Sequence, residues 1–134
     1  MKQFLIILAV ATCLVQPARA DQSAVEQVIQ NQMNAFMEDD FTEAFKYASP
    51  MIRSIFGTPE RFGDMVRNGY PMVWRPSDVR FFDSVERDGG VVQTVMVRDA
   101  SGALHLLEYR MLQVEPGVWK INGVRLLDDT AGAA

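Results

Sequence analysis

Residues 79–127 read VRFFDSVERDGGVVQTVMVRDASGALHLLEYRMLQVEPGVWKINGVRLL, and apolar and polar side chains alternate over most of this stretch. Such alternation indicates strands that bury one face of a sheet. Turn-forming residues interrupt the pattern at Asp88-Gly89-Gly90, Asp99-Ala100-Ser101-Gly102 and Glu115-Pro116-Gly117. We therefore predict four strands, at 79–87, 91–98, 103–114 and 118–127, with a bulge at Asn122-Gly123. Because short turns join neighbouring antiparallel strands, the strands should form a meander.

The residues before this sheet have the apolar spacing of helices. A capping box formed by Ser23 and Glu26 predicts the start of the first helix. Further helices are predicted to begin at Asp40, at Ser49-Pro50 and at Thr58-Pro59, with ends at Gly57 and Gly69 for the last two. An extended, proline-stiffened connector should then lead into the sheet. Helices followed by strands predict an α+β domain, with the N-terminal helices packed on one face of the four-stranded antiparallel meander sheet.

Length and composition narrow the class of protein. The chain has 134 residues, a formal net charge of -4, 49% hydrophobic residues, one His and one Cys. This length suits one ordinary domain, and the apolar fraction is too high for a disordered chain. An acidic balance argues against nucleic-acid binding, and a lone His with a lone Cys excludes a zinc cluster. No glycine-rich phosphate loop is present, so we expect no cofactor and no nucleic-acid partner.

The first 20 residues have the pattern of a secretory signal peptide. The apolar run at 4–15 is too short to span a bilayer as an ordinary helix. Ala18-Arg19-Ala20 places small residues at a cleavage site before Asp21. An uncleaved anchor is the alternative, and the sequence before Cys13 is a poor lipoprotein motif. We predict a leader at 1–20, a single α+β domain at 21–129 without a membrane span, and a mobile tail at 130–134.

Register at the turns sorts the strand residues onto two faces of the sheet. The turns predict that Val85 lies opposite Val92, Thr94 opposite Leu107, and Met111 opposite Ile121. We take the face with the Trp, Tyr and Met side chains as the inner face, against the helices. The candidates for ligand contact are its four polar side chains: Asp83, Thr94, His105 and Tyr109. The alternatives are a solvated strand end for Asp83, a core-edge ring for His105 and a wet hydroxyl for Tyr109.

The opposite face should carry an exposed apolar row. Phe82, Val95 and Leu106 are its candidate members, with Leu126 as a further one. Exposed rows of this kind usually mark association, so we expect a homodimer through the outer sheet face. Coverage of the row by the C-terminal tail is the alternative, although that tail lacks large apolar side chains.

Four stretches resemble a family of small secreted bacterial proteins: Ala48-Ser49-Pro50, Phe56-Gly57-Thr58-Pro59, Val66 through Pro76, and Trp119-Lys120-Ile121-Asn122-Gly123. The family is catalogued as domain of unknown function 4864, and the resemblance covers nearly the whole mature chain. It implies a periplasmic location and supplies no established catalytic residues. The order of elements also looks like the nuclear-transport-factor-2-like (SnoaL-like) superfamily, which implies a cone of helices on a curved sheet.

The stretch at 66–76 contains three more candidates. Tyr70 and Trp74 would roof the mouth of a pocket, and Arg75 would offer a partner to an anion. The structural alternative is that both rings plug the junction between helices and sheet.

Two functions follow from these observations. The first is a non-catalytic binding or interaction module with a small apolar pocket, which takes a small-molecule ligand. The alternative is an isomerase- or dehydratase-like enzyme, with Asp83 as base and Tyr109 or His105 as donor. No residue is assigned a catalytic or metal-binding role, because no nucleophile motif or ligand cluster is present.

Overall fold

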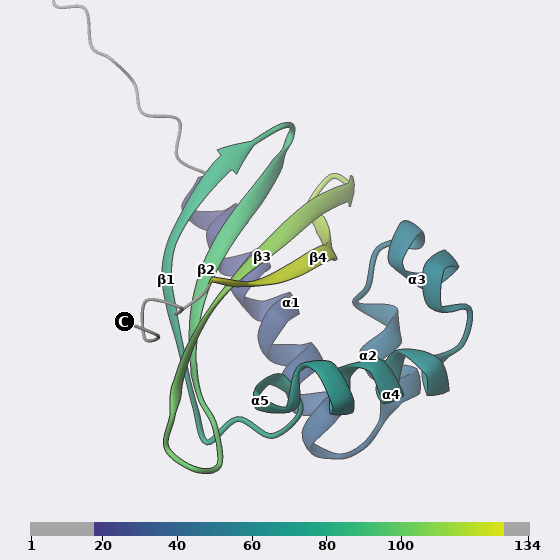
Figure 1. Cartoon of the computed structure of the whole chain (residues 1–134). Coiled ribbons are helices and arrows are strands. Elements are labelled where there is room, and N and C mark those ends of the chain that lie inside the picture. The colour runs from purple at the N-terminus through teal and green to yellow at the C-terminus, as the bar shows by residue number, and fades with distance from the viewer. Residues whose placement is uncertain (1–17, 128–134) are drawn as a thin grey trace, which may run out of the picture.

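The four strands lie side by side in the order in which they occur in the sequence, and every neighbouring pair is antiparallel. The computed structural model describes residues 18–127. Its elements are α1 (Arg19–Met37), α2 (Phe41–Lys46), α3 (Pro50–Phe56), α4 (Pro59–Gly69), α5 (Pro71–Trp74), β1 (Asp78–Arg87), β2 (Gly90–Arg98), β3 (Leu104–Glu115) and β4 (Val118–Leu127). In Figure 1 the helices lie on one side of an open, strongly bent sheet. The predicted α+β meander is therefore confirmed.

Helix starts follow the predicted capping residues at three of the helices. The side chain of Asp40 accepts a hydrogen bond from the Glu43 amide, and Ser49 and Thr58 cap α3 and α4 in the same way. Proline occupies the first turn of α3 and of α4, where its missing amide hydrogen costs nothing. Side-chain caps of this kind satisfy amide groups that have no partner within the helix.

Two helix predictions were wrong. The first helix begins at Arg19, so the capping box at Ser23 lies inside it. Arg19 lies before the predicted cleavage site, and the helix runs through that site. The connector at 71–74 is a single helical turn, α5, because Pro71 fits the first position of a helix as well as an extended segment. The predicted leader up to residue 17 and the tail at 130–134 lie outside the described residues.

The core forms where α1 crosses the inner face of the sheet (Figure 1). Val25, Ile29, Met33 and Phe36 line one side of α1 and are at most 1% exposed. They pack with buried strand residues such as Val95, Leu107 and Ile121. Four further aromatic rings extend this cluster between the helices: Phe41, Phe45, Phe56 and Phe62. No helix within residues 18–127 is both long and apolar enough to cross a membrane.

The loop between β2 and β3 is one residue longer than predicted. Arg98 pairs with Leu104, so the loop is Asp99–Ala103 and Thr94 lies opposite Glu108 instead of Leu107. The Asp99 carboxylate accepts hydrogen bonds from the Ser101 and Ala103 amides and closes this longer loop. Because one residue reverses the face of a strand, the β2 side chains at 91, 93, 95 and 97 point inward. Val95 is therefore fully buried, and its place in an exposed outer row was wrong.

A bulge in β1 also places strand residues on the face of the sheet opposite to the predicted one. Phe81 pairs with Val95 and Ser84 with Gln93, so Phe82 and Asp83 have no register partner between them. The side-chain amide of the fully buried Gln93 donates a 2.8 Å hydrogen bond to the Phe82 carbonyl and holds the bulge. Ser84 is consequently buried and Asp83 exposed, the reverse of the prediction for Asp83. The predicted pairs Val85–Val92 and Met111–Ile121 are confirmed.

The predicted bulge in β4 is present and anchors the helical layer. Arg110 pairs with Gly123 and Met111 with Ile121, which leaves Asn122 without a register partner. Ser49 donates from its amide to the Ile121 carbonyl at 2.8 Å and from its hydroxyl to Asn122 Oδ1 at 2.7 Å. The Ile121 amide donates to the Tyr47 carbonyl at 2.8 Å. The link between α2 and α3 therefore forms an isolated parallel β-bridge with β4, between Ala48 and Ile121.

We predict that Ser49→Ala lowers the free energy of unfolding by about 1.5–3 kcal/mol, because it removes both a helix cap and the donor to Asn122. Urea denaturation of the variant measures this. Thr58→Ala is the control, because Thr58 caps α4 without a second bond and should cost about 1 kcal/mol. Equal losses in the two variants would show that the Ser49–Asn122 bond contributes nothing.

Candidate functional site

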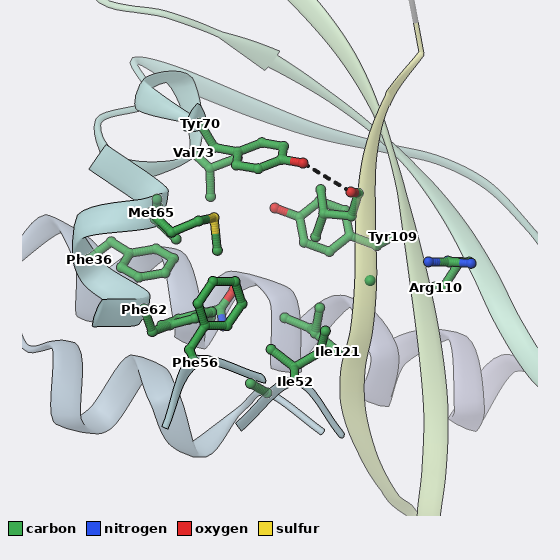
Figure 2. Close-up of a pocket in the computed structure, with 15 residues that line it drawn as sticks. Phe36, Ile52, Phe56, Phe62, Met65, Tyr70, Val73, Tyr109, Arg110 and Ile121 are labelled. Atoms are coloured by element: carbon green, nitrogen blue, oxygen red, sulfur yellow. Dashed lines mark hydrogen bonds between the residues drawn. The ribbon is translucent and has the colours of Figure 1, made fainter. Parts of the chain in front are cut away.

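A cavity lies between the helical layer and the β3–β4 side of the sheet (Figure 2). Its volume is about 270 Å³. Most of its lining is apolar, as in ligand pockets that use few polar groups. The side chains come from α1, α3, α4, α5 and the two strands, and the lining includes Phe36, Ile52, Phe56, Phe62, Met65, Val73, Ile121 and Val124.

Tyr109 supplies the one polar atom of this cavity that is both buried and without a hydrogen-bond partner among the described residues. The residue is completely buried on β3, and Figure 2 shows its hydroxyl end turned toward the side where Met65 and Tyr70 lie. Burial, with a smaller contribution from Tyr70, raises the pKa of the Tyr109 hydroxyl well above its ordinary value. Tyr109 is therefore a neutral hydrogen-bond donor at any physiological pH.

Two other polar side chains on the cavity, those of Tyr70 and Gln32, are engaged within the protein. The Tyr70 hydroxyl donates to the Val124 carbonyl at 3.2 Å, which Figure 2 marks as a dashed line. The Gln32 amide nitrogen donates to the Ala44 carbonyl at 3.1 Å. Two of the predicted candidates, Tyr70 and Tyr109, are thus brought together on one cavity.

Trp74, Arg75 and His105 lie elsewhere, along a shallow groove between α5 and the β2–β3 loop. Asp39 accepts hydrogen bonds from Trp74 Nε1 and Arg75 Nη2, each at 2.9 Å, and the guanidinium lies 4.1 Å from the centre of the Trp74 ring. These bonds, that from Trp74 first, hold the pKa of the Asp39 carboxyl below its ordinary value. Trp74 and Arg75 therefore fasten α5 to the end of α1, and do not roof the cavity.

His105 is held by a carboxylate at the same groove. Its Nε2 atom lies 2.7 Å from Asp99 Oδ2, and the other Asp99 oxygen accepts from the Ser101 hydroxyl. The bond to His105, followed by that from Ser101, keeps the pKa of Asp99 well below the usual range of an aspartate. This pair stabilises the five-residue loop that sets the register of the sheet.

Asp83 and Thr94 join neither site. Asp83 lies exposed in the β1 bulge, and Thr94 points to the outer face opposite Glu108. Asp83, His105 and Tyr109 therefore lie in three separate environments, and the acid–base pairs predicted for an enzyme are not assembled. Among the described residues that line the cavity, none is a carboxylate or an imidazole.

The cavity lining from α3 and α4 was not predicted as part of a site. Ile52, Phe56 and Met65 gave the signal of an apolar helical stripe, which looks the same whether the helix packs tightly or leaves a gap. Their contact with a cavity depends on how far α3 stands from the sheet, and this distance has no sequence signal.

We predict that Asp99→Asn lowers the melting temperature at neutral pH. The stability of the variant should also fall less steeply than that of the wild type as the pH falls from about 5 to about 3. A carboxyl with a lowered pKa stabilises the fold above its unfolded-state pKa, and this stability is lost as acid protonates it. Thermal unfolding across this pH range measures both effects. Asp83→Asn is the control on an exposed carboxylate; a parallel change in both variants would contradict the assignment to the Asp99–His105 pair.

Comparison with solved structures shows a likeness in fold. The chain resembles Aln2 from a Streptomyces species, with a TM-score of 0.57 and 19% sequence identity. The match covers 88% of this chain and 97% of that one, and at this identity it concerns the fold alone. It agrees with the predicted α+β layout of helices on an antiparallel sheet.

Sequence comparison gives the family. No curated protein matches the sequence. A family model described as "Domain of unknown function (DUF4864)" matches residues 18–134. This range includes every described helix and strand. The chain therefore belongs to the DUF4864 family, as the motifs at 48–50, 56–59, 66–76 and 119–123 predicted.

Proposed function

We propose that this protein is a non-catalytic binding module that holds a small apolar molecule in the cavity between α3, α4 and β4. The observation that carries the proposal is the cavity of about 270 Å³ with its apolar wall and one unpartnered hydroxyl. Protein interiors are close-packed, so an unfilled apolar space of this size forfeits packing energy that a ligand would restore.

The cavity supports binding better than catalysis. Isomerases and dehydratases need an acid and a base that face the same substrate. Among the described residues that line this cavity, the titratable ones are Tyr70, Tyr109 and Arg110, and the Arg110 guanidinium lies beyond the β4 ribbon in Figure 2. The groove beside α5 is a weaker candidate, because Arg75 and His105 are already paired with carboxylates of this chain.

We predict that Met65→Trp reduces binding of isopropylbenzene, an apolar probe, at least about tenfold. The half-buried Met65 side chain lies in the cavity, and a larger ring would occupy its free volume. Chemical-shift titration of the purified protein measures the affinity. Met51→Trp is the matched control, because Met51 is 50% exposed on α3 and does not line the cavity. Undiminished binding in Met65→Trp would place the probe outside this cavity.

We further propose that the outer sheet face pairs two copies of the chain. Because Val95 is buried, the exposed row is centred on Leu106. Its register neighbours Met96 and Leu127 are half-buried. Phe82, in the β1 bulge, is 43% exposed. A two-fold axis through the face would set each row against its copy. The support is the exposure of Leu106 and Phe82 outside the buried core.

Leu106→Glu should convert a dimer into a folded monomer, because the new carboxylate would be buried without a partner. Sedimentation equilibrium measures the mass, and circular dichroism checks the fold. Ile55→Glu, on the exposed side of α3, is the control and should leave the mass unchanged. A wild-type monomer, or a Leu106→Glu dimer, would contradict the proposed interface.

The proposed location is the periplasm, reached through a leader at 1–20 that is cleaved before Asp21. The family match from residue 18 supports this proposal, because it leaves the apolar run at 4–15 outside the shared domain. Cleavage there would remove Arg19 and Ala20 from the first turn of α1, a turn without a side-chain cap.

A further inference from the structure

Three buried side-chain atoms within residues 18–127 lack a hydrogen-bond partner: Gln93 Oε1, Trp119 Nε1 and the Tyr109 hydroxyl. Of these residues, only Tyr109 lines the apolar cavity. Buried polar groups are nearly always bonded, so an exception on a cavity wall calls for an explanation. We infer that the ligand presents an uncharged carbonyl oxygen, as in a ketone, aldehyde or ester, to the Tyr109 hydroxyl. This inference rests on the proposed binding function.

Tyr109 cannot satisfy its hydroxyl by turning away. The residue is fully buried, with Gln93 of β2 and Val124 of β4 as its register partners on either side. The nearby Tyr70 hydroxyl gives its hydrogen to the Val124 carbonyl. No hydrogen bond joins the two tyrosine hydroxyls. The Tyr109 hydroxyl thus lies beside the cavity without a partner, and a bound molecule that displaces the side chains covering it would supply the acceptor.

The cavity selects against charge. Among the described residues no carboxylate or imidazole lines it, and the guanidinium of the lining residue Arg110 lies against Gly123, beyond the β4 ribbon in Figure 2. A carboxylate ligand would lose its water and gain a single hydrogen bond, which does not offset the desolvation of a charge. The desolvation of an uncharged acceptor costs far less.

The acceptor is best supplied by a carbonyl. A pure hydrocarbon would fill the space but leave the Tyr109 hydroxyl unpaired. A ligand hydroxyl would accept from Tyr109 but bring a hydrogen of its own that needs an acceptor. A carbonyl oxygen satisfies Tyr109 and adds no unpaired donor.

Three probes of matched size test the inference: acetophenone, isopropylbenzene and benzoate. They differ chiefly in whether the ring carries a carbonyl, a hydrocarbon or a carboxylate group. Chemical-shift titration of the full chain, with the Met65 methyl group as the cavity reporter, gives an affinity for each. We expect acetophenone to bind about five- to tenfold more tightly than isopropylbenzene, the effect of one net hydrogen bond, and benzoate to bind weakest.

Tyr109→Phe assigns the preference to one atom. The variant should bind acetophenone and isopropylbenzene about equally, with isopropylbenzene at or above its wild-type affinity. Tyr47→Phe is the matched control: its hydroxyl donates to Glu43 and Tyr47 does not line the cavity, so the acetophenone preference should persist. If Tyr109→Phe fails to fold, the comparison of the three probes on the wild-type protein still decides the inference.

The outcomes separate the two proposals. If none of the probes shifts the Met65 methyl resonance, the binding function itself fails. If isopropylbenzene binds as tightly as acetophenone, or benzoate binds most tightly, the cavity binds ligands but the inferred carbonyl contact is wrong. If the acetophenone preference survives Tyr109→Phe, another group makes the contact and the role of Tyr109 is overturned.

Discussion

The pairing of the segment around Ser49 with β4 is the constraint on which the rest of the structure depends. Reciprocal backbone bonds between Tyr47, Ser49 and Ile121, together with the Ser49–Asn122 side-chain bond, attach the helical layer to the edge of the sheet. Because Ser49 is buried, replacing these hydrogen bonds by bonds to water would cost free energy. Because Ser49 is also the N-cap of α3, this attachment fixes where α3 begins relative to β4.

The cavity lies beside that attachment. The α1 helix packs closely on the sheet, and its Val25 and Ile29 side chains are fully buried. On the β4 side the α3 helix has no fully buried residue, and Ile52 and Phe56 reach only the cavity wall. The closely packed α1 thus stabilises the fold, and the loosely packed α3 leaves the cavity beside it.

Much of the fold was predictable from local chemistry, and the site only in part. The sequence shows features that depend only on neighbouring residues. These are the helix caps at Asp40, Ser49 and Thr58, the prolines that follow two of these caps, and the bulge in β4. The face of Asp83, Thr94 and Val95 could not be read in this way. It depends on one extra loop residue held by Asp99 and on a β1 bulge held by Gln93, a residue of the next strand. Tyr109 lies on its predicted face because the predicted β3–β4 register was correct. The cavity beside it depends on how the helices pack, which the sequence pattern does not show.

The most direct test of this account is a crystal structure of the protein under xenon pressure. Xenon enters apolar cavities that lack tightly held water, and it requires no knowledge of the natural ligand. The account predicts xenon among Phe56, Met65, Ile121 and Val124, or a copurified molecule in the same place whose oxygen accepts from Tyr109. A collapsed cavity, or one filled by ordered water bonded to the Tyr109 hydroxyl and excluding xenon, would contradict it.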